Sequence, residues 1–167
     1  MTLSRLEARE DRPTPSPMDV GVRVRDRARR VESQADAKGI SIEWNGSSEA
    51  EAPIDSEDLD LIADHLLDNA LKYTPAEGTV QVHVSQEDGA IVFRVSDSGM
   101  GFETEQGERL FDRFYRTSEA EQSADGGGLG LSIVKAVAEQ YGGTVRAESS
   151  GPGRGSTFGV RLPHNRE

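Results

Sequence analysis

The part of the sequence that most restricts the possible folds is a glycine-rich loop that leads directly into a helix. The loop reads Asp125-Gly126-Gly127-Gly128-Leu129-Gly130-Leu131-Ser132, and apolar residues at positions 131, 134, 137 and 138 then recur at helical spacing. Glycine adopts positive φ and lets a ligand approach the backbone closely, while the first turn of a helix offers free N–H groups and the positive end of the helix dipole. The segment therefore indicates either a phosphate-binding loop or a flexible connection before a helix.

Composition narrows the class of protein. The chain has 167 residues, enough for one domain with a real core and a short appendage. It contains no cysteine, which excludes disulfides and thiolate metal sites, and no apolar run reaches the length of a transmembrane helix. Because the formal net charge is −11, we expect no nucleic acid partner. A nucleotide can still bind, since net charge does not determine what a pocket holds.

The order of helical and strand patterns predicts an α/β fold. Residues 1–18 resemble the last turns of a helix followed by an extended proline-rich linker, and a helix that lacks its own start signal suggests a piece of a longer protein. The domain proper is expected over residues 19–167. Within it, helices are expected from Asp19 to about Gly39, from Ser56 to Thr74, over 105–111 and after the glycine-rich loop, and strands over 40–44, 80–84, 91–95, 144–148 and 157–162. Interleaved helices and strands of this kind predict an α/β two-layer sandwich.

Four polar side chains gather at one edge of the second long helix: His65, Asn69, Lys72 and Tyr73. At the helical repeat they fall within about a quarter to a third of the circumference, beside the apolar stripe. Asn offers an oxygen ligand to a hard cation, Lys a charge for phosphate and Tyr a flat apolar face. The alternative is the ordinary polar edge of an amphipathic helix.

A second group follows a buried strand and reads Asp97-Ser98-Gly99-Met100-Gly101. Burying a carboxylate at the end of a strand is costly unless it accepts hydrogen bonds, and the amino group of a purine would supply one. The alternative is a turn capped by Asp. A third group, Phe111 to Arg116, combines aromatic residues with two arginines that could reach phosphate, although aromatic side chains at this spacing also pack in cores.

In order and spacing, these segments resemble the sequence boxes of sensor histidine kinases. The resemblance covers about residues 19–163 and consists of an N box at His65–Pro75, a G1 box at Asp97–Gly101, an F box at Phe111–Phe114, a G2 box at Gly126–Leu131 and a G3 box at Gly155–Phe158. It implies the Bergerat ATP-binding fold shared with gyrase, Hsp90 and MutL, with about five strands packed on about three helices and a mobile ATP lid over residues 117–126.

The resemblance also implies a role for each matching residue. Asn69 would coordinate Mg²⁺, Lys72 would contact phosphate, Tyr73 would pack against adenine or ribose, and Asp97 would accept the adenine amino hydrogen. Thr157 would lie near the carboxylate of Asp97, and the glycines of the G2 box would serve as the hinge of the lid and bind the phosphates. The remaining nucleotide-binding residues that the resemblance implies are Gly99, Gly101, Arg116, Gly126, Gly128, Leu129, Gly130, Leu131 and Thr157.

Two features depart from the family pattern. The first N-box position is His65 where these kinases often have Asn, so its part in metal or phosphate binding is in doubt. No histidine-bearing H box is present, because His83 lies in a strand pattern and His164 in the tail. We therefore assign no catalytic residue to this chain and expect the accepting histidine on a dimerisation domain elsewhere in the same kinase.

Three functions fit these observations. The first is the catalytic domain of a bacterial two-component kinase, a cytoplasmic part of a membrane-anchored protein, which binds Mg²⁺-ATP and passes the γ-phosphoryl to histidine and then to a response regulator. The isolated chain would be monomeric and would transfer little phosphate to itself. The second is a serine protein kinase of the anti-sigma type on the same fold. The third is a nucleotide-gated interaction module without transfer activity.

Overall fold

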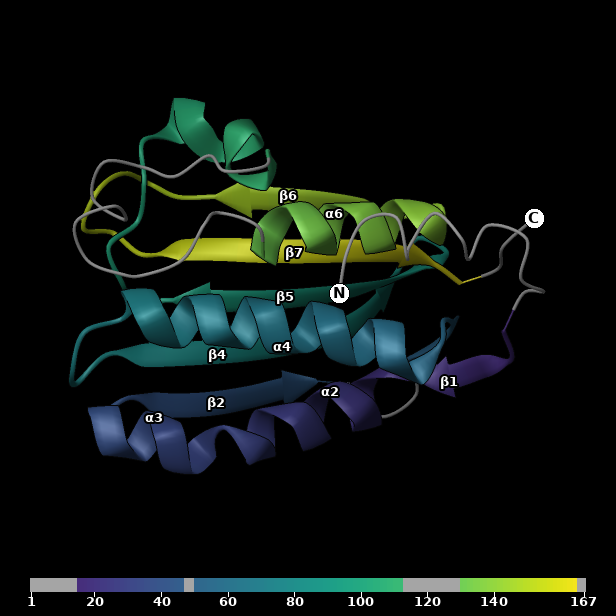
Figure 1. The fold of residues 1–167 in the computed structure, drawn as a ribbon, viewed down its shortest axis with the longest axis horizontal. Helices are drawn as coiled ribbons and strands as arrows, with labels where there is room; N and C mark the ends of the chain where they lie inside the picture. The colour runs from purple at the N-terminus through teal and green to yellow at the C-terminus, as the bar shows by residue number, and fades with distance from the viewer. Residues whose placement is uncertain (1–14, 47–49, 113–129, 165–167) are drawn as a thin grey trace.

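The computed structural model describes residues 15–46, 50–112 and 130–164 (Figure 1). Along the chain the elements are β1 (Pro17–Asp19), α2 (Val20–Arg30), α3 (Glu32–Lys38), β2 (Ser41–Gly46), β3 (Glu51–Pro53), α4 (Ser56–Tyr73), β4 (Thr79–Glu87), β5 (Ala90–Asp97), the 3-10 helix η1 (Thr104–Phe111), α6 (Gly130–Gln140), β6 (Thr144–Glu148) and β7 (Ser156–Pro163). No helix in these ranges is both long enough and apolar enough to cross a membrane.

The main sheet has five strands in the order β2-β4-β5-β7-β6. β2 runs parallel to β4, and the other neighbouring strands are antiparallel. A separate two-stranded sheet joins β1 to β3. Helices α2, α4 and α6 lie side by side over one face of the main sheet (Figure 1). The predicted α/β two-layer sandwich with a mixed sheet is therefore confirmed.

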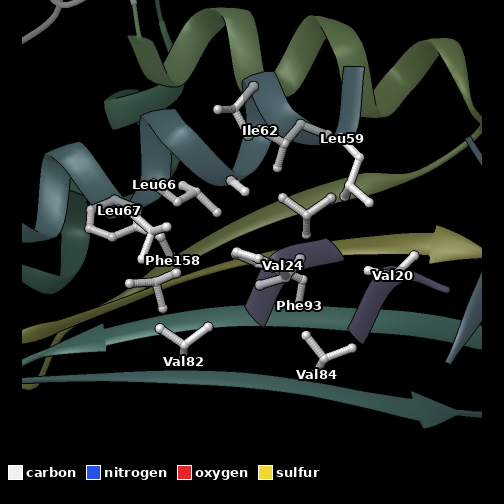
Figure 2. Close-up of a cluster of buried hydrophobic side chains, with 14 of the residues drawn as sticks. Val20, Val24, Leu59, Ile62, Leu66, Leu67, Val82, Val84, Phe93 and Phe158 are labelled. Carbon is white, nitrogen blue, oxygen red and sulfur yellow. The ribbon is translucent and has the colours of Figure 1, made fainter. Parts of the chain in front are cut away.

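The core lies between the three helices and the sheet. Alternating strand residues point to the helices because successive side chains of a strand face opposite sides, and α4 presents the apolar stripe that its sequence predicts. Each fully buried aliphatic or phenyl side chain contributes about 1.5–3 kcal/mol through burial. Figure 2 shows part of this cluster, with Leu59, Ile62, Leu66 and Leu67 of α4 above Val82, Val84, Phe93 and Phe158 of the strands.

The alternation in β5 also determines the orientation of the residue that ends it. Ile91, Phe93 and Val95 are buried on the helix side of the sheet, and Asp97 is the next position in the same alternation. The opposite face of the sheet is polar and carries side chains such as His83 and Arg94, which are paired in register. Asp97 is therefore the one carboxylate that β5 directs into the layer between sheet and helices.

The first long helix differs in detail from the prediction. The sequence predicts one helix from Asp19 to about Gly39, whereas the structure divides it into α2 and α3 at Val31, whose backbone (φ −101°, ψ 3°) leaves the helical region. The predicted end is confirmed, because Gly39 adopts a left-handed conformation (φ 75°) and stops α3. Lys38, the last residue of α3, donates its ammonium hydrogen bond to the carbonyl of Leu71 near the end of α4.

Two bidentate ion pairs join α2 to α4. Arg23 donates from Nε and Nη2 to the two carboxylate oxygens of Asp60, at 2.7 and 2.6 Å. One turn along, Arg27 makes the same pair of hydrogen bonds with Asp64. Forked guanidinium contacts of this type fix relative orientation as well as contributing energy, so they fix how α2 lies against the N-terminal half of α4.

Candidate functional site

The C-terminal end of α4 and the end of β5 meet, and the loop after Asp97 is pressed against the helix. The backbone N–H of Met100 donates to the carbonyl of Tyr73 at 3.2 Å. A Cβ on Gly99 would lie 2.2 Å from that same carbonyl oxygen and 2.9 Å from Oδ1 of Asp97. Position 99 therefore requires glycine because the loop and the helix end approach too closely for any side chain.

The carboxylate of Asp97 is buried but well provided with hydrogen bonds. Its Oδ1 accepts from the backbone N–H of Gly99 at 2.8 Å, and its Oδ2 accepts from the hydroxyl of Ser156 at 2.8 Å. Only 9% of the residue is exposed. Burial raises the pKa of Asp97, and the hydrogen bonds from Gly99 and Ser156 oppose that rise. Since a carboxylate has about four lone-pair sites, it retains the capacity to accept from a ligand.

Ser156, and not Thr157, supplies the hydroxyl next to Asp97, which corrects the prediction for Thr157. In the antiparallel pairing of β5 with β7, Asp97 lies opposite Ser156, whereas Thr157 lies opposite Ser96. The side chain of Thr157 consequently points to the other face of the sheet, where its hydroxyl is 2.8 Å from that of Ser96. A shift of one residue along a strand reverses the face that a side chain occupies.

The turn between β6 and β7 completes the loop structure around the carboxylate. Gly153 donates its N–H to the carbonyl of Met100 at 2.7 Å, and Gly155 donates to the carbonyl of Gly99 at 3.1 Å. Gly101 and Gly155 have positive φ (61° and 72°), and a Cβ at Gly155 would lie 2.1 Å from the carbonyl oxygen of Asp97. The segments predicted as the G1 and G3 boxes therefore form one hydrogen-bonded unit.

The predicted helix-edge residues lie together on α4 with different exposures. His65, Asn69 and Tyr73 are half-buried, while Lys72 is exposed. The ammonium of Lys72 lies 3.1 Å from a carboxylate oxygen of Asp68. An exposed pair of this kind contributes about 0–1 kcal/mol, so it would release Lys72 readily to a phosphate.

The first residue of α6 contacts His65. A Cβ at Gly130 would lie 3.2 Å from Nδ1 of His65, so the beginning of α6 packs against the imidazole ring. Burial lowers the pKa of His65, and the carboxylates of Asp68 and Asp64 oppose that change. Leu131, the next predicted residue, is half-buried against the core.

Several predicted residues lie outside the described ranges: Arg116, Gly126, Gly128, Leu129 and the lid over 117–126. Of the F box, the structure describes Phe111 and Asp112. Phe111 is buried and makes an edge contact with Phe158 of β7, with ring centroids 6.4 Å apart, and Asp112 is exposed. Phe111 therefore belongs to the core, which is the alternative that the spacing of the aromatic residues left open.

Two polar residues, one beside Asp97 and one near the loop that follows it, were not predicted as site residues from the sequence. Ser156 directly precedes the predicted residue Thr157, and only the register of β7 against β5 shows which of the two faces Asp97. Thr74 follows α4 and is 2% exposed, and its hydroxyl has no hydrogen-bond partner among the described residues. Such groups are commonly satisfied by water or a ligand. Its methyl group packs where a side chain on Gly78 would stand, 2.3 Å from an added Cβ, and the sequence gives no signal for this.

The residues that would bind a metal ion are few. In the described ranges, no three His, Asp or Glu side chains cluster in a way that could hold a metal. The amide oxygen of Asn69 is a type of ligand that hard cations accept, and Mg²⁺ is usually bound by few protein side chains together with waters and substrate phosphates. Asn69 therefore suits a Mg²⁺ ion whose other ligands are the phosphate oxygens of a nucleotide and water.

The architecture and the site define a nucleotide-binding domain built as an α/β sandwich with a buried acceptor carboxylate. Residues 54–166 match the family of histidine kinase-, DNA gyrase B-, and HSP90-like ATPases, and the chain belongs to that family. Within it, the chain is an ATP-binding catalytic domain of the kind found in two-component sensor histidine kinases.

Similar proteins agree in sequence and in structure. The sensor-like histidine kinase SenX3 of Mycobacterium tuberculosis is 36% identical over 162 residues, which is 96% of this chain and 39% of SenX3. The circadian input-output histidine kinase CikA of Synechocystis is 41% identical over 110 residues, which is 65% of this chain and 14% of CikA. The chain thus spans less than half of the length of these curated relatives.

Solved structures show the same fold. The mycobacterial sensor histidine kinase MprB superposes with a TM-score of 0.81 at 29% identity, covering 91% of this chain and 100% of that one. Full-length ShkA in complex with AMPPNP superposes with a TM-score of 0.82 at 32% identity, covering 99% of this chain and 34% of ShkA.

Proposed function

We propose that this domain binds Mg²⁺-ATP between α4, the loop after β5 and the beginning of α6, and that the whole protein transfers the γ-phosphoryl group to a histidine of its own dimerisation domain. The observation that supports this most directly is the buried carboxylate of Asp97, held by Gly99 and Ser156 with acceptor capacity to spare. A fixed acceptor at the end of a core strand suits the amino group of adenine.

The remaining residues would act by position and charge. Tyr73 would pack on the nucleoside, since it is half-buried at the end of α4 beside Asp97. Asn69 would hold the metal ion, and Lys72 would leave Asp68 to contact phosphate. A bound Mg²⁺ would neutralise charge on the phosphates. Catalysis would then consist of holding the γ-phosphoryl group in line with the incoming histidine.

The accepting histidine would come from outside this domain. His83 lies on the polar face of the sheet, opposite Arg94 in the strand register. The ring Nδ1 of His164 lies 2.8 Å from the carbonyl oxygen of Glu51, in the two-stranded sheet. Neither ring faces the layer between sheet and helices that contains Asp97.

The partners of the whole protein follow from the same proposal. The histidine kinase ThkA has been solved in complex with the response regulator TrrA, and that structure superposes with a TM-score of 0.75 at 19% identity, which indicates shared fold alone. We propose that this domain is the cytoplasmic part of a membrane-anchored kinase, serves a dimerisation domain and a response regulator, and is monomeric by itself.

The test uses radiolabelled ATP with and without the dimerisation domain of the parent protein. We expect the isolated chain to bind ATP and to incorporate no label, and the mixture to produce phosphohistidine on the added domain. Label at His83 or His164 of the isolated chain would contradict the proposal. Label on serine of an added protein would favour a serine kinase, and binding with no transfer to the added domain would favour a nucleotide-gated module.

A further inference from the structure

The contact between His65 and Gly130 joins the two helices that border the proposed phosphate end of the site. His65 lies on α4, one turn before Asn69, and Gly130 is the first residue of α6. The 3.2 Å separation between the ring Nδ1 and a Cβ built on Gly130 is shorter than ordinary van der Waals contact, so one of the two groups would have to shift to admit a side chain at position 130. The ring therefore occupies the space that a larger residue at position 130 would need.

The two helices run antiparallel, and α6 is also tied to α4 at its other end. Tyr141, which follows α6, donates its hydroxyl hydrogen bond to Asp58 in the first turn of α4. Asp58 is fully buried and Tyr141 is 7% exposed. Since Tyr141 fixes one end of α6, the packing at Gly130 determines where the opposite end of the helix is placed.

We infer that His65 is a positioning residue: its imidazole ring sets the location of the first turn of α6 relative to Asn69, and thereby places the positive end of the helix dipole relative to the phosphates of the nucleotide. This inference rests on the proposed function. It assigns to His65 a packing role toward α6, which does not require the ring to bind metal or to exchange a proton. Burial of the ring, which lowers the pKa of His65, is consistent with a neutral group beside the positive end of a helix.

If His65 is a positioning residue, its removal should weaken only the binding energy that the phosphates of the ligand contribute. His65→Ala would leave Asp97 and its partners untouched, so adenosine would bind as before, while the affinity for ATP would fall about three- to tenfold. Gly130→Ala would weaken ATP binding through the clash with the ring, and most of that loss would disappear once the ring is removed. The two substitutions should therefore be strongly non-additive, as is expected for residues in direct contact.

The experiment is a double-mutant cycle on the whole chain, with affinities for Mg²⁺-ATP and for adenosine measured by calorimetry and melting temperatures measured in parallel. His83→Ala, a histidine truncation on the opposite face of the sheet, is the matched control and should change neither affinity. If His65→Ala prevents folding, His65→Asn takes its place in the cycle.

Three results would overturn the inference. The first is an equal loss of ATP and adenosine affinity in the His65 variant, and the second is additive effects of the His65 and Gly130 substitutions. The third is an unchanged ATP affinity in the His65 variant. If the wild-type chain binds neither ATP nor adenosine, the proposed function itself fails, and this outcome is distinct from the others.

Discussion

The substitution Asp97→Asn separates the proposed ligand role of this residue from its structural role. The amide oxygen of Asn can accept from the N–H of Gly99, and its NH₂ group can donate to the hydroxyl oxygen of Ser156, which can act as donor or acceptor. Both internal hydrogen bonds can therefore survive, and the fold should be preserved. What changes is the face presented to adenine, where a donor replaces an acceptor.

The size of the effect follows from the hydrogen bond that is lost. A hydrogen bond to a charged group contributes about 1.5–3 kcal/mol, so the affinity for ATP should fall about 10- to 150-fold. Calorimetric titration with ATP, ADP and adenosine measures this loss, which should be similar for all three because they share the base. Asp88→Asn is the control, since Asp88 is exposed in a turn at φ 47°, a conformation that Asn tolerates.

Unchanged ATP affinity in the Asp97→Asn protein would remove Asp97 from the site and refute the reasoning. A loss of ATP affinity without a loss of adenosine affinity would refute it as well, because the carboxylate would then act on the phosphates. A large drop in melting temperature would show that the amide does not reproduce the hydrogen bonds to Gly99 and Ser156.

Three further predictions concern stability. Gly155→Ala should destabilise the domain by about 3 kcal/mol or more, because position 155 has positive φ and an added Cβ would clash with a carbonyl oxygen. Gly89→Ala is the control, since Gly89 has a similar φ but lies in open space, and it should cost about 1–2 kcal/mol. Equal losses of stability in denaturant unfolding would contradict this prediction. Thr74→Val should leave stability unchanged or raise it by about 1–3 kcal/mol, since it removes a buried hydroxyl without a partner in the described residues, and a marked loss would disprove it. Burial raises the pKa of Asp97 in the folded state, so the folded protein holds this proton more tightly than the unfolded chain does. The stability that this difference gives is fully present below about pH 4 and is lost as the pH rises through the pKa of Asp97 in the folded protein. The stability of the Asp97→Asn variant relative to wild type should therefore increase from acid to neutral pH, as measured by denaturant unfolding.

Much of the fold could be predicted because local patterns match the tertiary structure. The alternation at 80–84 and 91–95 predicts β4 and β5, and the stripe from Leu59 to Leu71 predicts α4. The position of Asp97 also follows from local pattern, since it continues the inward alternation of its strand. The burial of a carboxylate at the end of β5 could therefore be predicted before any contact was known.

The features that escaped prediction depend on contacts between distant segments. The choice between Ser156 and Thr157 depends on the register of β7 against β5, 59 residues away. The ion pairs of Arg23 and Arg27 each span 37 residues and cannot be distinguished in sequence from solvated arginines. The break between α2 and α3 at Val31 could not be predicted, because no proline or glycine lies at this position in the sequence.

The way in which Asp97 is held has a consequence for selectivity between purines. Guanine presents a carbonyl oxygen at the position where adenine presents its amino group, and a carboxylate that faced this oxygen would be repelled. Because the N–H of Gly99 and the hydroxyl of Ser156 each hold one of its oxygens, the carboxylate cannot turn away without losing a hydrogen bond. The same two donors that make burial of the charge tolerable would therefore also make this domain reject GTP.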